Sequence, residues 1–218
     1  MVSPGSGALN PYRSLGLQRN PFIAEDEPGV DPALWIDRGW SVAPPIRAKR
    51  FLQVIGVRGA GKTSHLLHWQ AQTGGAYCHY PPGLGRCKLP PVGAIAYWDE
   101  ADRIPPLLFR LALVWASHTH ATIVAGTHAD LGAIARSTGF TVETLHLPPF
   151  DAKTLLAWAT RRIQAVQLPD TVASLVLTEE QAAHIVAIAQ GSWCEAADHL
   201  HIWAAAAAQS ASLNRPTA

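Results

Sequence analysis

The sequence predicts an α/β fold in which a parallel sheet is followed by a small helical unit. Three observations support this. Apolar, β-branched segments alternate with helical segments between residues 51 and 147. A glycine-rich loop joins the first of these strands to the first helix. After Pro148-Pro149 the pattern becomes helical throughout. Because strands separated by helices are joined by crossover connections, we expect the sheet to be parallel.

The alternating part contains five expected strands and three expected helices. The strands are predicted over 51–55, 75–80, 92–98, 121–126 and 141–147, and the helices over 64–70, 106–118 and 130–137. The clearest helix is the second, in which large apolar residues recur at spacings of three and four: Leu107, Leu108, Leu111, Val114 and Trp115.

The last part of the chain predicts three further helices, over 151–166, 178–190 and 192–209. Asp151 and Thr178 are suitable N-caps, and Gly191 separates the last two helices. We therefore expect four regions: an extended segment over 1–45 that wraps the core, an α/β domain over 46–149, a helical lid over 150–210 and a disordered tail over 211–218.

The composition excludes several classes of protein. The 218 residues carry a net charge of +1, so no general attraction to DNA or to an anionic membrane is indicated. Three cysteines, with no C-x-x-C spacing, argue against a disulfide framework and against a zinc site. The sequence shows no signal peptide and no apolar stretch of membrane-spanning length, so we expect a soluble, cytoplasmic protein.

The glycine-rich loop matches the pattern G-x-x-x-x-G-K-[ST], which is typical of phosphate-binding loops. Its glycines allow main-chain N–H groups to surround phosphate oxygens, and the positive end of the following helix dipole adds to the attraction. We expect Lys62 to reach the β- and γ-phosphates and the Thr63 hydroxyl to ligate Mg²⁺. The predicted nucleotide-binding residues are Gly56, Val57, Arg58, Gly59, Ala60, Gly61, Lys62, Thr63 and Ser64.

Two adjacent carboxylates follow the predicted strand over 92–98. They lie where the carboxyl ends of parallel strands form the ligand crevice of such a sheet. We expect Asp99 to hold the metal, through a bound water, and Glu100 to polarise the attacking water as general base. The alternative is an ordinary surface Asp-Glu pair at the end of a strand.

Two further residues are candidates for a part in hydrolysis. Thr127, after the fourth strand, would contact the γ-phosphate or the water; alternatively it caps the helix that follows. Arg136, before the fifth strand, would reach the γ-phosphate of a neighbouring subunit; alternatively it binds the last carbonyls of its own helix.

The order of these features resembles that of AAA+ ATPases and their signal-transduction (STAND) relatives, over residues 46 to 208. The resemblance implies a sheet in the order 5-1-4-3-2, ATP with Mg²⁺ at a subunit interface, and therefore a homo-oligomer that remodels or licenses a partner. Gly16-Leu17-Gln18-Arg19-Asn20-Pro21-Phe22 is similar to the opening of the branch that includes secretion- and transposition-associated ATPases. The protein partner is not identified by the sequence, and DNA is possible but not indicated by charge.

One departure from the family concerns the lid. Residues 191–196 are similar to the family's G-x-x-R-x-A segment, but Cys194 stands where the family has an arginine that reaches the nucleotide. A thiol makes no charge-assisted contact with phosphate, so coupling between nucleotide and lid should be weaker. The first hypothesis is thus an active, oligomeric ATPase. A nucleotide-gated adaptor with little hydrolysis and a small-molecule kinase are the alternatives.

Overall fold

The computed structural model describes residues 10–23 and 35–213, and these divide into two compact units. The sheet unit contains residues 35–149 and 191–193, and the helical unit contains residues 10–23, 150–190 and 194–213. In the described part of the chain no helix is both long and apolar enough to cross a membrane. Residues 1–9 and 24–34 of the expected wrapping segment, and residues 214–218 of the expected tail, fall outside the described residues.

The sheet unit is built on five parallel strands in the order β2-β3-β4-β1-β5. This is the predicted order, read from the opposite edge, and it is confirmed. The strands are β1 (Arg50–Ile55), β2 (Ala76–His79), β3 (Ile95–Asp99), β4 (Thr122–Thr127) and β5 (Thr141–His146). Since β1, β3 and β4 are central, their carboxyl ends come together at one edge of the sheet, which is where the predicted site residues follow.

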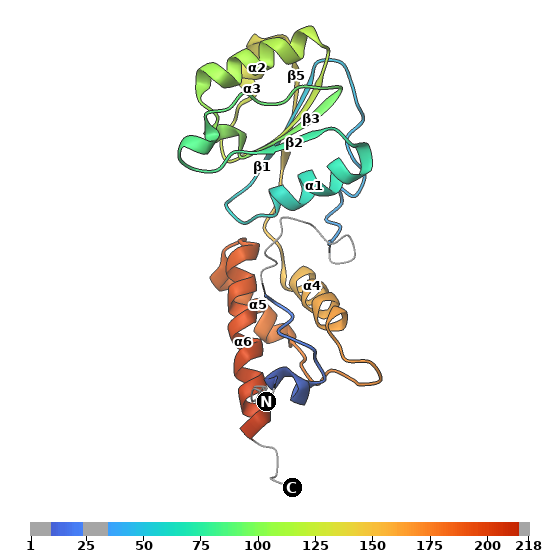
Figure 1. The fold of residues 1–218 in the computed structure, drawn as a ribbon. Helices are drawn as coiled ribbons and strands as arrows, with labels where there is room; N and C mark the ends of the chain where they lie inside the picture. Colours follow the sequence, from blue (N-terminus) through green and yellow to red (C-terminus); the bar gives the residue numbers. More distant parts are fainter. Residues whose placement is uncertain (1–9, 24–34, 214–218) are drawn as a thin grey trace, which may run out of the picture. The chain divides into compact units, whose positions relative to one another are not determined.

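Helices cover both faces of this sheet (Figure 1). On one face, α2 (Pro106–His118) and α3 (Gly132–Ser137) pack on Phe51, Trp98 and Ile123. On the other, α1 (Lys62–Thr73) packs on alternate residues of the same strands, including Val54 and Tyr97. Burial on both faces explains why the central strands have continuous apolar sequences rather than an alternating pattern.

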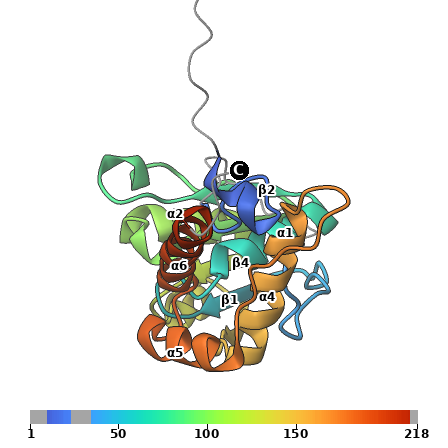
Figure 2. The same cartoon turned by 90° about the horizontal axis from the view of Figure 1, so that it is seen from below.

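The helical unit contains α4 (Ala152–Ala165), α5 (Glu179–Ala189) and most of α6 (Trp193–Leu213), as Figures 1 and 2 show. The predicted N-caps are present: Asp151 accepts from the Thr154 amide, and Thr178 forms a complete capping box with Gln181. Helix α6 continues to Leu213, so residues 211–213 are not part of a disordered tail. The Ser210 and Ser212 hydroxyls bond to carbonyls one turn back, within an alanine-rich helix.

The expected wrapping segment is divided between the two units. Residues 10–23 belong to the helical unit and residues 35–45 to the sheet unit. In the first part, Leu17 is fully buried and Phe22 packs between Trp158 and Trp203, with ring centroids 5.8 and 6.3 Å away. Asn20 is buried and donates to the His201 carbonyl at 3.0 Å. The G-L-x-x-N-P-F residues therefore hold this segment against α4 and α6.

Candidate functional site

The glycine-rich loop over residues 56–63 connects β1 to α1 and takes a conformation that depends on glycine. Gly59 and Gly61 have φ angles of +75° and +92°, in the left-handed region that other residues rarely adopt. Gly61 is the N-cap of α1 and offers no side chain to the first amides of the helix. Because no cap competes for these N–H groups, the N-terminus of α1 is suited to bind an anion.

The loop is held from outside by two other segments of the sheet unit. Arg38 donates to the Ala60 carbonyl at 2.9 Å and also to the Pro148 carbonyl. The Trp193 amide donates to the Gly59 carbonyl at 2.7 Å. A Cβ atom on Gly59 would lie 2.3 Å from the Ser192 hydroxyl oxygen, so this approach also requires glycine. These contacts fix the loop through the carbonyls of Gly59 and Ala60.

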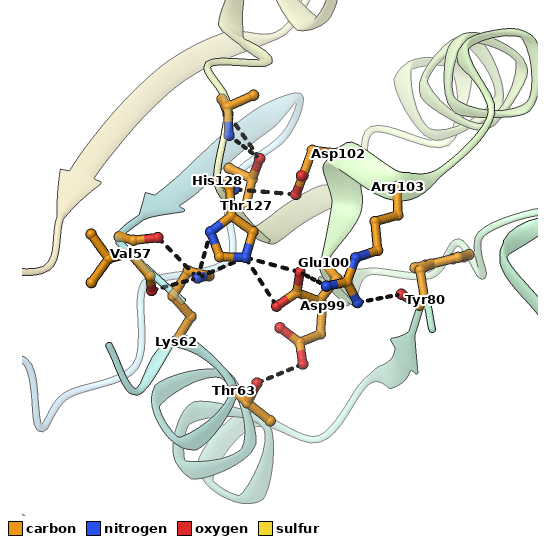
Figure 3. A network of polar contacts seen from close by, with 12 residues as sticks. Val57, Lys62, Thr63, Tyr80, Asp99, Glu100, Asp102, Arg103, Thr127 and His128 are labelled. Atoms are coloured by element: carbon orange, nitrogen blue, oxygen red, sulfur yellow. Dashed lines mark hydrogen bonds and ion pairs between the residues drawn. The ribbon is translucent and has the colours of Figure 1, made fainter. Parts of the chain in front are cut away.

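Lys62, the first residue of α1, is buried and folded back onto the loop (Figure 3). Its ammonium group donates to the carbonyls of Gly56 and Val57 at 3.0 and 3.1 Å and lies 3.3 Å from both ring nitrogens of His128. Burial lowers the pKa of Lys62, and the nearby carboxylates of Glu100, Asp99 and Asp102 partly offset this effect. The side chain thus lies within the loop that is predicted to hold phosphate.

Asp99 ends β3 and is fully buried beside α1. Its Oδ2 accepts hydrogen bonds from the Thr63 hydroxyl at 2.8 Å and the Tyr77 hydroxyl at 2.9 Å, and His79 Nδ1 lies 3.2 Å away. Its Oδ1 has no partner among the described residues, although it is buried. A Cβ on Gly126 would come within 2.9 Å of this oxygen, so glycine in β4 leaves room for the carboxylate.

Glu100 follows in a left-handed conformation, with φ of +58°. Such a conformation costs about 1–2 kcal/mol for a residue other than glycine, and strain of this kind is frequent at functional sites. The carboxylate lies 3.0 Å from His128 Nε2 and 3.1 Å from the Arg103 guanidinium (Figure 3). The imidazole of His128 therefore lies between Lys62 and Glu100, and its main-chain N–H donates to Asp102 at 3.1 Å.

Within the described residues, the two remaining candidates form no hydrogen bond or ion pair with Lys62, Asp99 or Glu100. Thr127 is fully buried, and its hydroxyl bonds to the main chain of Ala129 two residues on, at 2.8 and 3.1 Å. Arg136 is exposed in the last turn of α3. Hydrogen bonds from Gln53 and the Gly132 amide are the main causes that lower the pKa of Asp130, and the positive charge of Arg136 lowers it further. The structure thus brings together Lys62, Thr63, Asp99 and Glu100.

Sequence reasoning missed three parts of this arrangement. It weighed Thr127 but not His128, although the first residue beyond β4 lies at the edge where the other strands deliver their polar residues. Arg38 and Trp193 gave no local signal, because each acts on a loop that is distant in sequence.

Neither a scan against protein-family models nor a search of curated proteins finds a match to this chain. Among solved structures, the chain is similar to Cdc6p from Pyrobaculum aerophilum, with a TM-score of 0.52 and 15% sequence identity over 76% of this chain and 58% of that chain. It also matches a RuvB variant from Thermotoga maritima, with a TM-score of 0.47 and 16% identity over 70% and 53% of the two chains. The chain therefore spans little more than half the length of either protein. The similarity to Cdc6p shows the fold alone, a five-stranded parallel sheet with helices on both faces.

Proposed function

We propose that this protein binds ATP with Mg²⁺ and hydrolyses it, and that it works as an oligomeric switch or remodeller of a protein or protein–DNA partner. The observation that carries the proposal is the hydrogen bond of 2.8 Å between the Thr63 hydroxyl and Asp99. It joins the phosphate-binding loop to the acidic end of β3, which is the arrangement that a metal-bound triphosphate needs.

The residues present fit a magnesium ion. Thr63 and Asp99 supply oxygen ligands, which Mg²⁺ prefers, and the unpartnered Oδ1 of Asp99 is a buried acceptor in need of a partner. Among the described residues no group of three or more His, Cys, Asp or Glu could hold a metal alone. This suits an ion that completes its shell with water and phosphate. When bound, the ion would neutralise charge that develops on the phosphates.

The remaining steps fall to the chain's own groups. A triphosphate entering the loop would accept hydrogen bonds from the amides at the start of α1 and draw the Lys62 ammonium away from the Gly56 and Val57 carbonyls. His128 contacts both Lys62 and Glu100. Movement of the lysine would therefore let the imidazole shift and weaken its contact with the Glu100 carboxylate. Glu100 would then be able to take a proton from the attacking water.

Two substitutions test this assignment. Lys62→Ala should weaken ATP binding roughly 100-fold, because a charge-assisted contact to phosphate is lost. Glu100→Gln should keep ATP binding but lower turnover by about 10²–10⁴-fold, the usual contribution of a general base. Calorimetry with Mg-ATP and phosphate release measure the two effects, with the exposed positions Lys153→Ala and Asp198→Asn as controls. Unchanged phosphate release by Glu100→Gln would remove Glu100 from the mechanism.

The same measurements distinguish the ATPase from a second candidate function, a nucleotide-gated adaptor with little hydrolysis. The pairing of Glu100 with both His128 and Arg103 favours it, since a base held by two partners is not poised to act. Cys194, at the family's lid-arginine position, points the same way. An adaptor should release phosphate no faster than its own Glu100→Gln variant while still binding Mg-ATP.

The exposed guanidinium of Arg136 suits a contact between subunits. In that case Arg136→Ala should lower turnover by about 10³-fold or more without affecting ATP binding. Mixing it with Lys62→Ala subunits should restore part of the activity, because each variant supplies what the other lacks. Absence of complementation in a mixed oligomer of demonstrated composition would leave Arg136 a structural residue of α3.

A further inference from the structure

Helix α2 exposes a continuous apolar surface that its own unit does not cover. Its inward residues, such as Phe109 and Leu113, are buried in the core. Its outward residues are also apolar: Leu107 is 70% exposed, and Leu111, Trp115 and Val114 are between 40% and 52% exposed. We call the set Leu107, Arg110, Leu111, Val114 and Trp115 the α2 stripe. Residues spaced by three, four and seven share one side of a helix, so these side chains form a single patch.

The α2 stripe carries positive charge only. Arg110 is its only charged residue, and helix α2 contains no Asp or Glu. Within the described residues Arg110 forms no ion pair, and it is exposed. An occupant of this surface should therefore combine apolar side chains with carboxylates.

A surface of that kind is present in the helical unit. Between the end of α4 and the start of α5, Val172 and Val176 are 90% and 70% exposed. Asp170, Glu179 and Glu180 are exposed in the same segment, and none of the three forms an ion pair among the described residues. We call these five residues the 170–180 surface. It has apolar and acidic groups where the α2 stripe has apolar and basic ones.

We propose that the α2 stripe of one molecule binds the 170–180 surface of a second copy of this chain. Valine side chains would cover Leu111 and Trp115, and Glu179 or Glu180 would pair with Arg110. Because the two surfaces are different, such contacts are head-to-tail and build a ring or a filament rather than a closed dimer. The inference rests on the proposed function only in its expectation of a homo-oligomer, and it requires neither ATP binding nor hydrolysis.

Charge reversal with rescue gives the sharpest test. Sedimentation velocity of the full chain over a range of concentrations should show self-association. Arg110→Glu should raise the dissociation constant roughly tenfold or more, and so should the double variant Glu179→Arg/Glu180→Arg. The triple variant that carries both changes should recover most of the association. Lys153→Glu and Asp198→Arg are matched reversals at exposed positions outside both surfaces, and they should have no effect.

A second variant tests the apolar part. Trp115→Ala should raise the dissociation constant by roughly 10- to 30-fold, as expected for an aromatic residue in the centre of an interface. Ile202→Ala, at an exposed position on α6, is its control. Mg-ATP binding and thermal unfolding of each variant, measured separately, distinguish a failed interface from a failed nucleotide site or a failed fold. A monomeric wild type with and without Mg-ATP, association that survives both reversals, or reversals that do not rescue each other would each overturn the proposal.

Discussion

The sheet unit contains two polar clusters, each centred on a buried side chain, that differ in how completely their groups are paired. One is centred on Gln53 in β1: its side-chain amide donates to Asp130 at 2.6 Å and to Thr144 at 2.8 Å, and its carbonyl accepts from the Leu131 amide at 2.9 Å. Every hydrogen-bonding group of that side chain is used. The other cluster, at the ends of β3 and β4, leaves Oδ1 of the buried Asp99 without a partner among the described residues and lowers the pKa of Lys62 by burial.

The difference distinguishes a network that suits a structural role from one that suits ligand binding. A buried polar group without a partner costs about 1–3 kcal/mol, more if it is charged, so folding alone does not favour the Asp99 cluster as it stands. The Gln53 cluster pays no such penalty, because its members satisfy one another. The Asp99 cluster is therefore the one in which a ligand would supply the missing partner. Substitutions in the two clusters test this difference.

The largest expected effect is that of Asp99→Asn. The variant keeps an acceptor for the Thr63 and Tyr77 hydroxyls but loses the charge that would hold Mg²⁺. We expect turnover to fall by about 100-fold or more, a typical result of removing one group that stabilises transition-state charge. Thermal stability should be unchanged or higher, since a buried charge with one unpartnered oxygen is removed. ATP affinity measured with magnesium and with EDTA should no longer differ.

Tyr77→Phe is the matched control for this experiment. It removes one hydrogen bond to the same carboxylate but keeps its charge, so the magnesium dependence of ATP binding should persist. If Asp99→Asn bound ATP with an undiminished response to magnesium, the metal site would have to lie elsewhere.

A smaller effect is expected for His128→Ala, which tests the contact between Lys62 and Glu100. Turnover should fall by roughly tenfold to 100-fold, in the range for one preorganised polar group, while ATP affinity changes little. His128→Asn should restore part of the rate, because an amide can still contact both neighbours.

Thr127→Val is the comparison for His128. It removes a hydroxyl bonded within its own turn and should mainly lower stability, by about 1 kcal/mol. A rate loss with Thr127→Val that exceeded that of His128→Ala would instead favour the original prediction of Thr127 as the γ-phosphate contact.

The sequence predicted most of the fold because local signals agreed with one another. Continuous apolar strands, a glycine-rich turn and capped helices each indicated the same α/β arrangement, and two adjacent carboxylates at the end of β3 marked the acidic edge of the sheet. The pairing of Thr63 with Asp99 followed from topology, since parallel strands deliver their carboxyl ends to one edge.

What the sequence did not reveal depends on side-chain direction and on contacts between distant segments. Whether Thr127 or His128 reaches the lysine is decided by the turn after β4, in which the threonine hydroxyl bonds to Ala129. Gln53 lies in an apolar strand, and nothing in the local sequence indicated its hydrogen-bond partners, because they lie in two other segments. The length of α6 was underestimated because serines at a helix end are usually read as a stop.

The smallest expected effect concerns the Gln53 cluster and the stability of the folded protein in acid. Hydrogen bonds from Gln53 and from the Gly132 amide lower the pKa of Asp130 in the folded protein. A carboxyl whose folded pKa is depressed adds stability that is fully present above its unfolded pKa, about 3.9, and is lost as the pH falls through the lower folded value. Asp130→Asn should therefore have a lower free energy of unfolding than wild type at pH 7, and the difference should narrow below about pH 4.

Urea unfolding between pH 3 and pH 7 measures this difference, and ATP binding at pH 7 should be unaffected. A loss of ATP binding in Asp130→Asn would mean that the two clusters are coupled, and the distinction between a structural network and a binding site would fail.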